Sequence, residues 1–213
     1  MAHAAEPVLI LAVALNFVAL GVSRLRPVIH GVALQGALLG ILPFLTHPEI
    51  GLRGGLLVGG TVALKGLVIP ALLFRAMREA NIQHEVQPVV GFIASLVLGA
   101  VGTGLAFVSA STLPLADEHT NALVVPASLS TVLTGFLMLT TRRKAIMQVV
   151  GYLILENGIF LFGLLLVEAM PFLVEIGVLL DLFTGVFVMG IIIHHINREF
   201  AAAGTEQLSE LKD

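Results

Sequence analysis

The chain contains no cysteine and no tryptophan, and few of its 213 residues are charged. The absence of cysteine excludes thiolate ligands for zinc or iron–sulfur clusters, and it excludes a disulfide framework. Charged residues make up 12% of the chain, against roughly 25% in soluble domains, whereas hydrophobic residues make up 57%. This composition indicates an integral membrane protein with no room for a soluble catalytic domain. The net charge of −3 gives no support to a nucleic-acid partner.

Seven apolar stretches follow one another. Each is close in length to a transmembrane helix, which needs about 17–25 residues to cross a hydrocarbon core of about 30 Å. They cover residues 7–22, 28–45, 54–74, 88–110, 122–140, 145–167 and 172–193. The sequence therefore predicts an all-α integral membrane protein with seven transmembrane helices. We expect an N-terminal four-helix membrane region over residues 1–120, a three-helix region over 121–198 and a short cytoplasmic tail over 199–213.

Basic residues gather at alternate ends of these stretches, which predicts how the chain is oriented. One side holds Arg24, Arg26, Arg75, Arg78, Arg142, Arg143, Lys144, Arg198 and Lys212. The loops of the other side hold only Arg53. Because basic loops remain cytoplasmic, we expect the N-terminus outside and the C-terminus inside a cytoplasmic (inner) membrane, with multiple passes.

Three ionisable residues lie inside the spans, near the middle of the membrane: Lys65, Glu156 and Asp181. At this depth each costs at least about 2.5–3.5 kcal/mol on insertion scales, and such residues often mark ion or proton routes. One interpretation is a buried ion pair between Lys65 and one acid that only locks helices together. Such a pair leaves the other carboxyl without a counter-ion, and that carboxyl can load and release a proton.

Proline and glycine near these residues suggest local distortion and close packing. Pro70 lies five residues after Lys65 and has no N–H to donate to the preceding turn, so we expect a kink there. Such a kink can line a cavity or simply reflect packing. Gly177 and Gly185 lie four residues on either side of Asp181, where small residues allow a neighbouring helix to approach closely.

Histidine and lysine positions argue against the common membrane cofactors. His30, His194 and His195 lie at cytoplasmic helix ends, where histidine normally meets the helix dipole or reaches the interface, and not on facing helices as haem ligands would. A retinal protein carries its Schiff-base lysine in its seventh helix, whereas Lys65 lies in the third span. We predict no cofactor and no metal.

The last three spans carry a recognisable pattern. Residues 151–158 read Gly-Tyr-Leu-Ile-Leu-Glu-Asn-Gly, and residues 173–177 read Leu-Val-Glu-Ile-Gly with Asp181 four positions later. This pattern resembles component E of membrane-bound hydrogenase and formate hydrogenlyase complexes. Further similarity lies in Arg142–Lys144, Lys65 with Pro70, Asn81–Ile82 and the terminal residues 208–212. The motif residues include Gly151, Asn157, Gly158, Glu175, Gly177 and Gly185.

The same three spans are similar to the K subunit of respiratory complex I and to the C subunit of multisubunit cation antiporters. The acid of the third helix in those subunits corresponds to Asp181. Their second-helix acid corresponds to Leu153, one turn or about 4.5 Å before Glu156. The face of the helix is kept and the height of the acid is shifted.

The resemblance implies a non-catalytic membrane subunit of a complex-I-like, proton-translocating oxidoreductase. It would lie among antiporter-like subunits and a subunit similar to the H subunit of complex I, with a peripheral redox arm as an indirect partner. Glu156 and Asp181 would be proton-transfer carboxyls, and Lys65 would modulate them. Glu175 lies near the outer end of its span, as an interfacial charge or a proton exit. The alternatives are a stand-alone proton-coupled transporter and a membrane anchor.

Overall fold

The computed structural model describes residues 2–46, 52–79, 88–112 and 123–164, and its elements over these residues are all helices. They are α1 (Ala2–Gly21), α2 (Leu25–Thr46), α3 (Leu52–Ala63), the π-helix η1 (Leu64–Val68), α4 (Ile69–Glu79), α5 (Phe92–Thr112), α6 (Val124–Thr141) and α7 (Ala145–Leu164). The prediction of an all-helical chain is confirmed for this part of the sequence.

Five helical segments are long and apolar enough to cross a membrane. They are Leu25–Pro43, Val58–Arg78, Phe92–Thr112, Val124–Thr141 and Ala145–Leu164, and Ala5–Gly21 forms a shorter apolar helix before them. The protein is therefore a multi-pass membrane protein. The seventh predicted span, residues 172–193, lies outside the described residues, together with Glu175, Gly177, Asp181 and Gly185.

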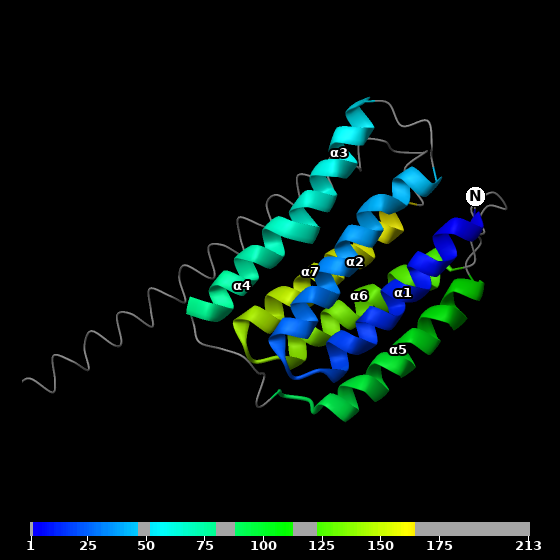
Figure 1. Cartoon of the computed structure of the whole chain (residues 1–213). Coiled ribbons are helices and arrows are strands. Elements are labelled where there is room, and N and C mark those ends of the chain that lie inside the picture. The colour runs from blue at the N-terminus through cyan, green and yellow to red at the C-terminus, as the bar shows by residue number, and fades with distance from the viewer. Residues whose placement is uncertain (1, 47–51, 80–87, 113–122, 165–213) are drawn as a thin grey trace, which may run out of the picture.

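The helices form one bundle in which α1, α2, α6 and α7 lie at the centre. Figure 1 shows α3 and α4 along one side of this centre and α5 along the opposite side. One apolar core joins helices far apart in sequence, since Leu20 and Val28 share a buried cluster with Met138 and Met147. Helices α1 and α2 thus pack directly on α6 and α7.

Glycines bring the backbones of α6 and α7 into direct contact. A Cβ atom on Gly158 would lie 2.6 Å from the backbone nitrogen of Val132, and one on Gly151 would lie 2.9 Å from that of Leu139. Cβ atoms essentially never approach so closely, and a Cβ atom on Gly135 would collide with the backbone of α7. Two of the motif glycines therefore fix α7, the helix of Glu156, tightly against α6.

The helix that carries Lys65 changes its winding at that residue. The N–H of Ile69 donates to the carbonyl of Leu64, five residues earlier, within the π-helix Leu64–Val68. Pro70 follows directly and has no N–H of its own. The disruption expected before Pro70 thus takes the form of a π-helical turn, and Figure 1 shows α3 and α4 continuing through it as one rod.

Arg142, one of the basic residues expected in a cytoplasmic loop, is buried and only 1% exposed. Its Nη2 donates to the carbonyl of Leu20 at 2.7 Å, and its guanidinium carbon lies 4.7 Å from the centre of the Phe92 ring. The contact places a cation at the C-terminal end of α1, where the helix dipole favours positive charge. Arg143 and Lys144 are exposed beside it, as expected for a loop.

Candidate functional site

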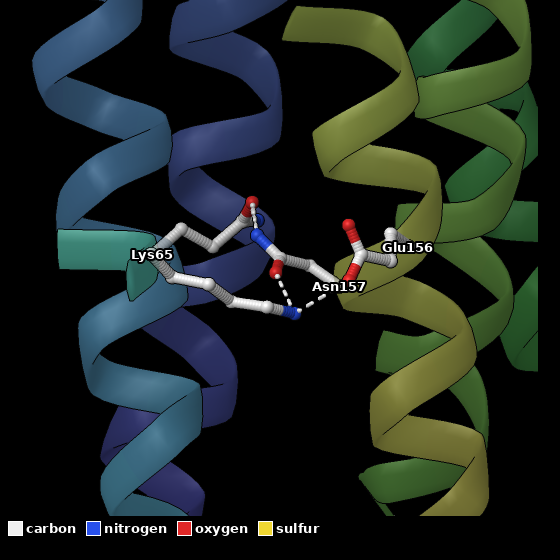
Figure 2. Close-up of polar contacts among 4 residues, drawn as sticks. Lys65, Glu156 and Asn157 are labelled. Carbon is white, nitrogen blue, oxygen red and sulfur yellow. Dashed lines mark hydrogen bonds and ion pairs between the residues drawn. The ribbon is translucent and has the colours of Figure 1, made fainter. Parts of the chain in front are cut away.

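Lys65 and Glu156 meet in the centre of the bundle. The Nζ atom of Lys65 lies 3.2 Å from Oε1 of Glu156, and the two side chains are 5% and 6% exposed. Figure 2 shows the lysine reaching from η1 toward Glu156 and its neighbour Asn157 on α7. The two residues that the sequence placed at comparable depth thus come from different helices and form a buried ion pair.

Among the described residues, the carboxylate of Glu156 has little support besides this lysine. Neither of its oxygens accepts a hydrogen bond from the described residues, although the side chain is buried. A buried charge is stable only when it is paired and its remaining lone pairs are satisfied. Glu156 is paired with Lys65, but its lone pairs are not satisfied within the described residues. One of its oxygens can therefore still bind a proton or accept a hydrogen bond from a further donor.

Besides its ion pair with Glu156, Lys65 donates a hydrogen bond to a carboxamide. Its Nζ donates to Oδ1 of Asn157 at 3.2 Å, and Nδ2 of Asn157 donates to Oε1 of Gln35 on α2 at 3.1 Å. The centre of the Phe160 ring lies 5.2 Å from the same Nζ, a distance at which the face of a ring attracts a cation. The ammonium group is therefore held by a carboxylate, an amide oxygen and an aromatic ring.

The polar contacts continue beyond Gln35 into α1 and α6. Nε2 of Gln35 donates to Oδ1 of Asn16 and to the carbonyl of Ala12, both at 2.9 Å. Nδ2 of Asn16 donates to the hydroxyl of Thr131 at 2.9 Å, and this hydroxyl donates to the carbonyl of Ala127 at 2.7 Å. Asn16, Gln35 and Thr131 are all buried. A connected polar network thus crosses the bundle at the level of the ion pair.

Asn16, Gln35 and Thr131 were not among the predicted site residues, because they are not ionisable. A usable signal was present, since Asn16 and Gln35 are carboxamides inside apolar stretches. A buried carboxamide needs a partner in a membrane as it does in a protein core. Two such groups in neighbouring helices therefore indicate a shared polar network.

Two glycines of α2 allow α3 and η1 to pack closely against it. A Cβ atom on Gly36 would lie 2.9 Å from the Cβ of Lys65, and one on Gly40 would lie 2.8 Å from Cγ2 of Val62. The aliphatic part of Lys65 therefore packs directly over Gly36. This contact fixes where the lysine side chain begins its path to α7.

The remaining predicted residues divide into those described and those outside the described part. Asn157 belongs to the site, Gly151 and Gly158 lie at the contact of α6 with α7, and Pro70 is buried at the start of α4. Leu153, at the position of the complex I acid, is buried in the apolar core. Within the described residues no group of three or more His, Asp or Glu side chains could hold a metal ion.

Comparison with known proteins gives one relative along most of the chain and others along half of it. The chain is 36% identical over 193 residues to the uncharacterized protein Rv0085 of Mycobacterium tuberculosis, covering 89% of this chain and 87% of that protein. It is 35% identical over 100 residues to hydrogenase-4 component E of Escherichia coli K12 and of Shigella flexneri, covering 47% of this chain and 45% of those proteins. No protein-family model and no solved structure matches the chain.

Proposed function

The chain belongs to the same family as the Mycobacterium tuberculosis protein Rv0085, and from this premise we propose that it is a non-catalytic membrane subunit of a complex-I-like, proton-translocating oxidoreductase. Its distant relation to hydrogenase-4 component E supports a complex of the membrane-bound hydrogenase type. Its partners would be antiporter-like membrane subunits and a subunit similar to the H subunit of complex I. A peripheral redox arm would supply the electrons, and the assembly would lie in the cytoplasmic membrane.

The observation that supports a role in proton transfer is the buried ion pair. A Lys65 ammonium beside a Glu156 carboxylate can pass one proton to it, which leaves a neutral amine and a neutral carboxyl at the same place. The Glu156 oxygen that accepts no hydrogen bond from the described residues would be the atom from which that proton leaves. Asp181 would be the next carboxyl, which receives the proton and returns Glu156 to its charged form.

A purely structural ion pair would be expected to satisfy both oxygens of the carboxylate, because an incompletely bonded buried charge destabilises the fold. Functional sites are where such incomplete bonding is commonly retained. The incomplete bonding of Glu156 within the described residues therefore favours proton transfer over a locking role.

Affinity purification of the tagged protein from its own host in mild detergent, followed by mass spectrometry, tests the partners. The proposal expects antiporter-like subunits and a metal-containing peripheral arm to be retained, and a tagged unrelated membrane protein to retain neither. Recovery of the chain alone, as a monomer or homo-oligomer, would contradict the proposal. That result would favour the stand-alone proton-coupled transporter instead.

A further inference from the structure

One series of hydrogen bonds among the described residues leads from Lys65 through α7, α2 and α1 to α6, and its donors all point away from the lysine. Lys65 donates to Asn157, Asn157 to Gln35, Gln35 to Asn16, and Asn16 to Thr131, which donates to a backbone carbonyl of α6. We call the four residues after the lysine the amide string. Each carboxamide in it presents its oxygen toward the lysine and its nitrogen away from it.

The far end of the amide string fixes this direction. Both N–H groups of the Gln35 amide are used, one on the carbonyl of Ala12 and one on Asn16. The hydroxyl of Thr131 donates its single proton to the carbonyl of Ala127. It can therefore only accept a hydrogen bond from Asn16. Reversal of any carboxamide would place two donors or two acceptors against each other at a buried position, which is unfavourable.

We propose that the amide string is a positioning device that aims the oxygen of Asn157 at Lys65 and thereby holds the ammonium beside Glu156. Carboxamides and hydroxyl groups have fixed donor and acceptor roles and are not general acids or bases near neutral pH. The string therefore orients the lysine without offering protons a path into α1 and α2. This inference rests on the proposed function only where it assigns proton transfer to Lys65 and Glu156.

The test uses the full chain in lipid bilayers, with the lysine side-chain nitrogens labelled with ¹⁵N and the asparagine side chains with ¹³C for solid-state NMR. The chain's lysines are Lys65, Lys144 and Lys212, and Lys65→Met identifies the lysine–asparagine signal that belongs to the site. We expect this signal in the wild type and its loss in Gln35→Met, which leaves the Asn157 amide without its acceptor. Persistence of the signal in Gln35→Met would overturn the proposal.

A second pair of variants acts at the far end, four hydrogen bonds from the lysine, and serves if Gln35→Met fails to fold. Thr131→Val keeps the shape and removes the hydroxyl, whereas Thr131→Ser keeps the hydroxyl and should restore the wild-type signal. Ser128→Ala is the matched control, since Ser128 carries a fully buried hydroxyl on the same helix, whose hydrogen bond among the described residues is local, to the carbonyl of Val125. Loss of the signal in Thr131→Val alone supports the string, and equal loss in Ser128→Ala overturns it.

Proton-coupled turnover of the intact complex separates this inference from the proposed function. We expect turnover about tenfold or more lower in Gln35→Met, the change that corresponds to the loss of one hydrogen bond to a charged group. A lost NMR contact with unchanged turnover would support the positioning of Lys65 and contradict its role in proton transfer. A retained contact would contradict the positioning, whatever the turnover.

Discussion

Removal of Lys65 should destabilise the bundle far more when Glu156 is present than when it is absent. Lys65→Met keeps the long apolar stem and deletes the ammonium group, which leaves the buried carboxylate without the cation that lies 3.2 Å from it. It also leaves the oxygen of Asn157 without its donor. Glu156→Gln removes the charge from the other side and keeps the shape of the side chain.

The expected magnitude follows from the burial of both groups, which are 5% and 6% exposed. Breaking a buried ion pair by removing one partner costs about 3–5 kcal/mol, whereas removing both charges together is often close to neutral. Proton uptake by the orphaned Glu156 limits this cost, so the figure for Lys65→Met is an upper bound. We expect the two single variants to be coupled by at least about 1.5 kcal/mol, the low end for a charged hydrogen bond.

A double-mutant cycle on the free energy of unfolding measures this coupling. The wild type, Lys65→Met, Glu156→Gln and the double variant are unfolded in mixed micelles by increasing sodium dodecyl sulfate. The double variant should be more stable than the sum of the single effects predicts. Additive effects within about 0.5 kcal/mol would refute a direct ion pair between these residues.

Three further changes test the packing around the site, each by the unfolding midpoint in the same micelles. Gly158→Ala should lower the free energy of unfolding by about 1–3 kcal/mol because the added Cβ meets the backbone of α6. The control Gly104→Ala, with no atom within 4 Å of the added Cβ, should leave the stability unchanged or raise it. Equal effects would contradict the close contact of α6 with α7. Arg142→Met should cost about 1.5–3 kcal/mol through its lost bond to the end of α1, while exposed Arg143→Met should stay within about 0.5 kcal/mol. The reverse order would show that the wrong arginine was assigned the buried position. Gly36→Ala should displace Lys65 and lower the coupling energy between Lys65 and Glu156 in the double-mutant cycle. An unchanged coupling energy would contradict the close contact of Gly36 with Lys65.

The helical spans were predictable because a run of apolar residues long enough to cross a bilayer is a local property of the sequence. The shared depth of Lys65 and Glu156 was predictable too, since each residue of a helix adds a fixed rise. Their pairing was not, because it depends on which helices are neighbours. Asp181 was an equally suitable partner by depth, and it lies outside the described residues.

Three features depended on tertiary packing that local rules do not contain. The rule for proline predicted a disruption before Pro70 and could not specify a π-helical turn. Arg142 lies in the loop between α6 and α7, as its charge suggested, but the ends of α1 and α5 bury it there. The roles of Asn16 and Gln35 appear only when α1 and α2 are placed against α6 and α7, where each carboxamide finds its partners.

The most direct test of the central claim is proton pumping by the intact complex in inverted membrane vesicles, with the double variant Glu156→Gln and Asp181→Asn. Both changes keep the side-chain shape and remove the titrating group, so we expect the complex to assemble and its redox activity to proceed without proton translocation. The matched control Ser128→Ala should pump as the wild type does. Assembly with normal pumping in the double variant would contradict the assignment of these carboxyls to the proton pathway.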